Sequence, residues 1–310
     1  MEIPTLEQSR DATVQGEASV SGLEWLRIGG VALAVRDLDR VATFYREVIG
    51  LELIAQAGGV VRLGVAGTAF LDLLHRPDAL PDDPATAGLF HTAFLLPSRA
   101  DLGSWLAHFG QLGQRLDGAA DHLVSEAVYL RDPEGNGIEV YADRPRAQWR
   151  WRDDGEGRRV EMANRPLDAQ GLLRAATPRA GAPDGTHIGH VHLRVGSIGD
   201  ARRFYGDALG MDVTALWENA AFLSTGGYHH RIAANTWSSA GTGPRDPARA
   251  GLASVTLDIA DAAALAGIVQ RTGLAGPSLS GLDLNDPWGT MLQLRLAASC
   301  GSLTSPPNQQ

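Results

Sequence analysis

The chain has 310 residues, of which 44% are hydrophobic and 20% charged, enough for two domains with substantial hydrophobic cores. Its formal net charge is −9 and its arginines are scattered, which argues against nucleic acid as a partner. No stretch reaches the roughly 20 consecutive apolar residues of a membrane-spanning helix, so no membrane partner is expected.

The single cysteine, Cys300, can form neither an internal disulfide nor a thiolate-rich zinc site. The first 27 residues lack the apolar segment of a signal peptide. Both features favour a cytoplasmic location. A transition metal would have to be held by histidine and carboxylate side chains, and the chain has nine histidines.

An internal repeat begins near the N-terminus. Residues 28–52 read IGGVALAVRDLDRVATFYREVIGLE, and residues 188–212 read IGHVHLRVGSIGDARRFYGDALGMD, at an offset of 160. Each copy begins with the apolar/polar alternation of a strand and continues into a helical FY segment that ends at a glycine.

A weaker pair of segments completes the repeat. Residues 88–94 (GLFHTAF) match 251–257 (GLASVTL), and residues 132–139 (DPEGNGIE) match 286–293 (DPWGTMLQ), where a D-P-x-G turn precedes a final strand. The chain therefore contains four units, each predicted to fold as a strand, a helix and three strands. The units lie near 28–77, 88–145, 188–237 and 251–297.

These units predict two tandem domains, at 27–145 and 188–297. Residues 146–187 between them are predicted to be a linker with one short helix around 168–175. Residues 1–26 and 298–310 are predicted to be poorly ordered tails.

Three motifs carry a resemblance to a known family: DHLVSEAVYLRDPEGNGIEVYADRP at 121–145, GHVHLRV at 189–195 and GGYHHRIAANTW at 226–237. With the four βαβββ units, they resemble the vicinal-oxygen-chelate superfamily. Within it they are most similar to two-domain, catechol 2,3-dioxygenase-like proteins, the type I extradiol ring-cleaving enzymes. The resemblance spans about residues 26–297. It implies an α+β protein whose βαβββ modules form cupped mixed sheets in two tandem domains.

The resemblance also implies a metal held by two histidines and one glutamate. This ligand set suits Fe(II), accepts Mn(II), and leaves positions open for a catechol and O₂. Units two and three together supply the complete set, as His91, Glu139 and His190. The corresponding positions of units one and four carry other residues, namely Gly30, Ser254 and Gln293.

Further site residues follow from the same resemblance. Tyr129 matches the tyrosine that orients the substrate, and His122 matches a histidine beside it. His229 and His230 are placed on the last strand of unit three, where the family keeps an acid–base histidine. Adjacent strand residues face opposite ways, so only one of them can face the cup, and His230 is preferred. His122 and His230 are predicted to handle protons.

Two alternative readings concern the ligands themselves. A lone His91 would be read as a buried strand histidine, but its match to His190, with Glu139 in register, favours a metal site. His192 shares a strand face with His190 and could replace it as ligand. His190 is preferred because it follows Gly189, as the resemblance requires.

The expected function is an Fe(II)-dependent extradiol dioxygenase that opens catechol or a substituted catechol with O₂. Two rival hypotheses stay open: a glyoxalase-like lyase or isomerase with another metal, and a non-enzymatic protein that binds an aromatic drug. The sequence leaves the oligomeric state open, although sheets of this superfamily often pair across subunits in a homo-oligomer. The sequence leaves open which catechol is accepted.

Overall fold

The structure, a computed structural model, describes residues 24–177, 179, 181–274 and 281–297. The two predicted tails lie outside these residues, except for residues 24–26. No helix in the described part of the chain is long and apolar enough to cross a membrane.

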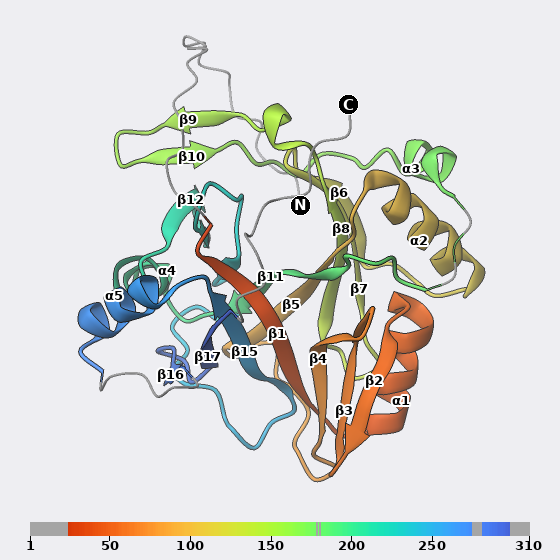
Figure 1. Ribbon diagram of the computed structural model, residues 1–310, viewed down its shortest axis with the longest axis horizontal. Helices are drawn as coiled ribbons and strands as arrows, with labels where there is room; N and C mark the ends of the chain where they lie inside the picture. The colour runs from red at the N-terminus through yellow and green to blue at the C-terminus, as the bar shows by residue number, and fades with distance from the viewer. Residues whose placement is uncertain (1–23, 178, 180, 275–280, 298–310) are drawn as a thin grey trace.

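The first half of the chain contains two strand–helix–three-strand units (Figure 1). Unit one comprises β1 (Leu26–Val35), α1 (Leu38–Phe44), the π-helix η1 (Tyr45–Ile49), β2 (Glu52–Ala57), β3 (Val60–Val65) and β4 (Thr68–His75). Unit two comprises β5 (Gly88–Leu95), α2 (Arg99–Gln111), β6 (Gly118–Asp121), β7 (Ser125–Arg131) and β8 (Gly137–Asp143).

The second half repeats this order. Unit three comprises β11 (His187–Arg194), α4 (Ile198–Ala201), the π-helix η3 (Arg202–Ala208), β12 (Asp212–Trp217), β13 (Ala220–Ser224) and β14 (Ile232–Asn235). Unit four comprises β15 (Gly251–Ile259), α5 (Ala262–Thr272), β16 (Leu282–Asn285) and β17 (Met291–Leu296). Its remaining predicted strand would fall in or beside 275–280, outside the described residues.

The helices of the four units begin in the same way. A side-chain oxygen just before each helix accepts a hydrogen bond from the backbone N–H three residues further on, which satisfies a donor that the helix leaves free. The four capping residues are Asp37, Ser98, Ser197 and Asp261. The FY segments of units one and three end at Gly50 and Gly210, as the repeat predicted.

The strands form two large sheets, and each sheet joins a unit from one half of the chain to a unit from the other. Units four and one form a seven-stranded sheet in the order β16-β17-β15-β1-β4-β3-β2. Units three and two form an eight-stranded sheet in the order β12-β13-β14-β11-β5-β8-β7-β6. Each predicted domain therefore contributes one unit to each sheet.

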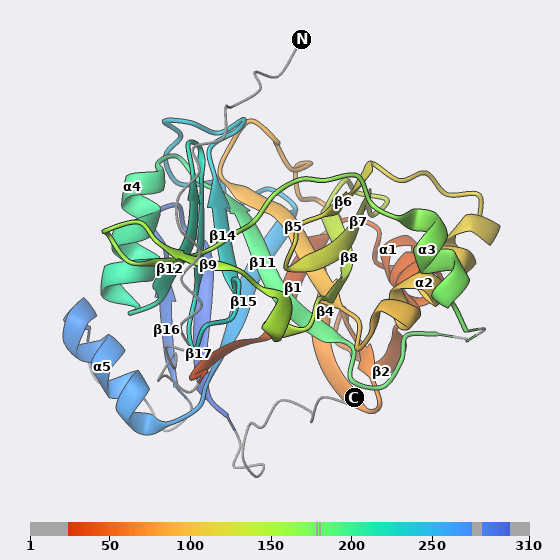
Figure 2. The same ribbon diagram turned by 90° about the horizontal axis from the view of Figure 1, so that it is seen from above.

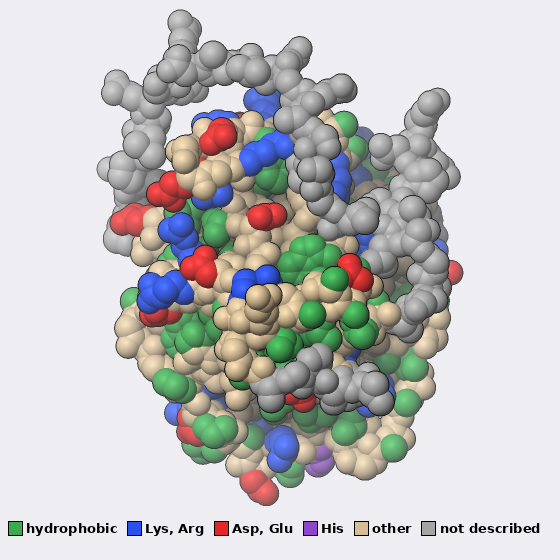
Figure 3. Space-filling model, turned by 60° about the vertical axis from the view of Figure 1, so that its left-hand side comes forward, with side chains coloured by type: hydrophobic (Ala, Val, Ile, Leu, Met, Phe, Trp, Pro, Cys, Tyr) green, Lys and Arg blue, Asp and Glu red, His purple; other side chains and the backbone are tan. Residues whose placement is uncertain are grey.

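The helices lie outside the two sheets, α4 and α5 toward one end of the molecule and α1, α2 and α3 toward the other (Figure 2). The principal hydrophobic core contains buried residues from strands and helices of all four units, among them Leu33, Leu102, Val191 and Ile268. On the face shown in Figure 3, acidic and basic side chains are intermingled rather than gathered by sign.

The linker contains more structure than the sequence predicted. Its helix α3 (Ala169–Ala175) lies where one was expected. The linker also forms the 3₁₀-helix η2 (Arg146–Gln148) and a hairpin of β9 (Trp151–Asp153) and β10 (Arg158–Val160). Such short strands carry almost no periodic signal. A second hydrophobic cluster holds this segment in place, with Trp149 and Val160 packed among side chains of unit three such as Phe222.

Candidate metal centre

The three predicted ligands come from three neighbouring strands of the eight-stranded sheet. His91 lies on β5, Glu139 on β8 and His190 on β11, and β5 pairs with both of the other strands. One ligand atom from each residue lies within 4.8 Å of the others. All three side chains are buried. Because hydrogen-bonded strands are about 4.8 Å apart, side chains on one face of adjacent strands can converge in this way.

A close approach of β8 to β5 supports this convergence. Gly137 begins β8, two residues before Glu139. A Cβ atom at this position would collide with the backbone carbonyl oxygen of Phe90 and crowd the Cβ of His91. Glycine therefore lets the strand that carries the carboxylate lie against the strand that carries the first histidine.

Two histidine nitrogens converge on one carboxylate oxygen. His190 Nε2 donates a hydrogen bond to Glu139 Oε2 at 3.1 Å. His91 Nε2 lies 3.0 Å from the same oxygen, but no hydrogen bond forms at this contact, so this buried nitrogen has no hydrogen-bond partner. An unsatisfied buried polar atom costs about 1–3 kcal/mol. The arrangement therefore fits a cation that would accept lone pairs from all three side chains.

The ionisation states also fit a cation site. Burial lowers the pKa of His190 to about 4, although Glu139 opposes the shift, so the imidazole is neutral and able to ligate at neutral pH. Burial alone would raise the pKa of Glu139, but His190 and His91 hold it well below its usual range. The neutral imidazole of His190 and the carboxylate of Glu139 thus face each other, with the ring of His91 beside them.

Tyr129 and His122 form a hydrogen-bonded pair beside this group. His122 Nδ1 donates to the carbonyl oxygen of Ala163 at 3.0 Å, and its Nε2 lies 2.6 Å from the Tyr129 hydroxyl. With the ring proton on Nδ1 for the first bond, Nε2 is an acceptor, so the tyrosine hydroxyl donates to it. Burial and the nearby charge of Glu139 raise the pKa of Tyr129 well above its usual value, which keeps that hydroxyl protonated.

His229 and His230 lie in a bend just before β14, and not on the strand as expected. The expected strand placement is therefore wrong, and strand alternation does not decide which of the two side chains faces the cavity, because side chains alternate in this way only in extended strands. The two rings instead contact each other. His229 Nε2 donates to Asp143 Oδ1 at 2.9 Å, and the two Nδ1 atoms are 2.7 Å apart.

The donor and the acceptor of each hydrogen bond in this chain can be assigned. With its ring proton on Nε2, which donates to Asp143, His229 accepts at Nδ1. His230 therefore donates from its Nδ1 and carries its lone pair on Nε2. His230 lines the cavity described below, and its ring centroid lies 4.1 Å from that of His190.

His192, the alternative ligand, lies outside the converging group. Its Nε2 accepts a hydrogen bond from the Asn235 amide at 3.0 Å, and its ring packs at 4.9 Å from His91. The positions that match the ligands in the other sheet contain no comparable set. These are Gly30 on β1, Ser254 on β15 and Gln293 on β17.

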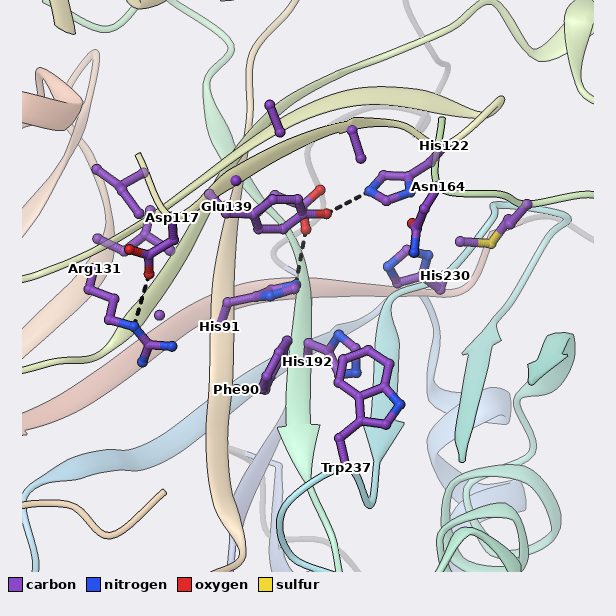
Figure 4. Close-up of a pocket in the computed structure, with 18 of the residues that line it drawn as sticks. Phe90, His91, Asp117, His122, Arg131, Glu139, Asn164, His192, His230 and Trp237 are labelled. Carbon is purple, nitrogen blue, oxygen red and sulfur yellow. Dashed lines mark hydrogen bonds and ion pairs between the residues drawn. The ribbon is translucent and has the colours of Figure 1, made fainter. Parts of the chain in front are cut away.

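A cavity of about 430 Å³ opens beside the candidate ligands (Figure 4). His91, Glu139, Tyr129, His122 and His230 all contribute to its wall. Sequence reasoning missed several other lining residues, including Phe90, Asp117, Arg131, Met162, Asn164 and Trp237. Trp237 ends a motif that the sequence singled out. Met162 and Asn164 come from the linker, where no sequence pattern pointed to a binding role.

Comparison with known proteins places these features in a family. A family model described as the glyoxalase/bleomycin resistance protein/dioxygenase superfamily matches residues 27–140 and 187–277. The chain is 39% identical over 259 residues to catechol-2,3-dioxygenase of Bacillus subtilis (strain 168), which covers 81% of this chain and 89% of that protein. It is 28% identical over 120 residues to biphenyl-2,3-diol 1,2-dioxygenase 3 of Rhodococcus globerulus, which covers 38% of this chain and 63% of that protein.

A solved structure shares the fold. Glyoxalase I from Zea mays superposes with a TM-score of 0.52 at 16% identity, over 88% of this chain and 93% of that one. The resemblance and the fold class predicted from the sequence are thereby confirmed.

Proposed function

The chain belongs to the glyoxalase/bleomycin resistance protein/dioxygenase superfamily as one of its dioxygenases, and we propose that it is an Fe(II)-dependent extradiol enzyme that opens catechol or a substituted catechol with O₂. In this proposal His91, Glu139 and His190 hold the metal. His122 and His230 transfer protons, and Tyr129 orients the substrate.

The observation that carries the proposal is the convergence of one carboxylate and two imidazoles within 4.8 Å, with the Nε2 of His91 left without a hydrogen-bond partner. Two histidines and a carboxylate on one face are typical of non-haem Fe(II) oxygenases, and they leave coordination positions open. Fe(II) held there supplies Lewis acidity toward the catechol hydroxyls and the redox chemistry that O₂ requires.

Tyr129 and His122 provide a route for one substrate proton. A catechol hydroxyl beside Tyr129 can donate its proton to the phenol oxygen while the phenol proton moves to His122 Nε2, only 2.6 Å away. The carbonyl of Ala163 continues to accept from Nδ1 and holds the ring in place. Tyr129 thus orients the hydroxyl, and His122 takes up the proton.

His230 provides a second acceptor at the cavity wall. Its Nε2 carries the free lone pair, because Nδ1 donates to His229. When His230 takes a proton, the carboxylate of Asp143 can stabilise the resulting positive charge through His229. The adjacent Phe222 and Trp217 keep this part of the cavity apolar, which limits competing proton exchange with water.

The test is ring cleavage by protein loaded anaerobically with Fe(II). On admission of air, we expect catechol to give a yellow ring-opened product together with stoichiometric O₂ uptake. Glu139→Gln should lose bound iron and activity together. Asp258→Asn, which changes a strand carboxylate in the other sheet, serves as the matched control and should keep both.

The proposal is wrong if the iron-loaded protein leaves catechol and substituted catechols unchanged. Turnover that needs nickel, cobalt or zinc and proceeds without O₂ would instead support the lyase or isomerase hypothesis.

A further inference from the structure

The cavity wall beyond the metal-binding and proton-transfer residues is mostly apolar. Its apolar members include Phe90, Ile138, Met162, Trp217, Phe222 and Trp237. Trp237 is 50% exposed and lies edge-on to Phe90, with ring centroids 5.1 Å apart. Aromatic edges and faces of this kind favour an uncharged, apolar group over an ionised one.

The cavity has room for more than a single ring. Its volume of about 430 Å³ lies within the range of roughly 300–1,000 Å³ that encloses drug-sized ligands. A catechol at the candidate ligands therefore leaves space for a ring substituent. The charge of the surrounding side chains decides which substituents are accepted.

Arg131 is the one lysine or arginine among the described residues that line this cavity. It follows Tyr129 by two residues on β7, so the two side chains share a face of the sheet. Its guanidinium is already engaged: Nε lies 2.9 Å from Asp117 Oδ2, and Nη1 donates to the carbonyl oxygen of Gly135 at 3.1 Å.

Asp117 lies immediately before β6 and also lines the cavity, and Figure 4 shows its carboxylate directed at Arg131. A carboxylate on the substrate ring would have to displace Asp117 from Arg131 or lie beside an uncompensated negative charge. The ion pair thus removes the one permanently cationic side chain that could recognise an anionic ring.

We propose that this site, if it is the catechol site proposed above, selects uncharged catechols with apolar substituents. Asp117 excludes ring carboxylates by occupying Arg131. Asp117 is then a specificity-determining residue, because its carboxylate neutralises the Arg131 guanidinium that would otherwise bind an anion.

The experiment measures dissociation constants in anaerobic, Fe(II)-loaded protein by calorimetry, at constant ionic strength. The two probes are 4-ethylcatechol and 3,4-dihydroxybenzoate, which differ at one ring position in a group of similar size. We expect wild-type protein to bind 4-ethylcatechol at least about tenfold more tightly. Asp117→Asn should reduce the ratio of the two dissociation constants by about two- to fivefold, the effect expected of one half-exposed charged contact.

A double variant and a surface variant separate the causes. In the Asp117→Asn variant the Arg131 guanidinium is free to bind a carboxylate. Adding Arg131→Met removes that guanidinium, so the double variant should lose the gain in binding of 3,4-dihydroxybenzoate. Asp207→Asn removes an exposed carboxylate outside the cavity and should keep the wild-type ratio.

Two results would overturn the inference: equal or preferential binding of 3,4-dihydroxybenzoate by wild-type protein, or a ratio unchanged by Asp117→Asn. Neither result contradicts the proposed function if ring cleavage of catechol is observed. Absence of both binding and cleavage for every catechol would reject the proposed function and this inference together.

Discussion

His229 and His230 are adjacent in the chain, yet their rings are joined through Nδ1 atoms 2.7 Å apart, and His229 is in turn bonded to Asp143. Consecutive histidines therefore have different positions in one hydrogen-bonded chain. His230 lines the cavity, whereas His229 connects it to a carboxylate at the end of β8.

Replacing His230 should cost more activity than replacing His229. His230→Gln removes the proposed proton acceptor, and we expect kcat to fall roughly 10²–10⁴-fold. His229→Gln leaves the acceptor but disturbs its tautomer, and we expect a loss of about 10–100-fold in kcat with a smaller change in KM. Steady-state kinetics with iron content measured on the same samples would check this. Equal losses in the two variants would contradict the assignment.

Tyr129→Phe should keep the metal and lose activity. The substitution removes the hydroxyl that links the substrate to His122 but leaves the ring that packs 5.6 Å from His91. We expect normal iron content with kcat/KM reduced by about 10–100-fold, the value of one lost hydrogen bond to a charged group. Iron analysis and kinetics provide the measurement, and unchanged kcat/KM would exclude the orienting role.

Metal removal should lower the thermal stability of the protein. A cation that binds only the folded state, present at 100 times its Kd, stabilises that state by about 2.7 kcal/mol. For a chain of this length we expect the Tm of the loaded protein to exceed that of the chelator-treated protein by several degrees. Differential scanning calorimetry under nitrogen would measure the shift. His91→Asn should abolish it, whereas His75→Asn, at an exposed strand end, should retain it.

Gly137→Ala should disturb the metal centre without changing any ligand. The added methyl group would collide with the backbone of Phe90 and push β8 away from β5. We expect a loss of about 1–3 kcal/mol in the free energy of unfolding, as for other overpacked sites, together with weaker metal binding. Urea denaturation and metal titration would measure both effects.

Gly110→Ala is the matched control for this change. Gly110 lies in α2, and a Cβ there would meet open space. Since alanine is favoured over glycine in helices by up to about 1 kcal/mol, the control should be neutral or stabilising. A comparable destabilisation in both variants would contradict the steric explanation.

The repeat, the four units and the superfamily could be predicted from the sequence alone because they are recorded in local patterns. Each of these patterns depends only on residues that are close in the sequence. They are the strand alternation, the capping residues and the glycines after the FY segments. The repeat also aligned His91 with His190 and placed Glu139 on a final strand, and the structure brings these three side chains together.

The tertiary structure alone decided which distant side chains meet. Asp143 reaches His229 across 86 residues, and the linker supplies Met162 and Asn164 to a cavity formed by units two and three. The pairing of Asp117 with Arg131 depends on the register between β6 and β7. Such contacts arise from sheet register and chain crossing, which no periodicity encodes. The sequence therefore determined which metal-ligating side chains are available. The packing of the two halves of the chain determined which other residues surround those side chains.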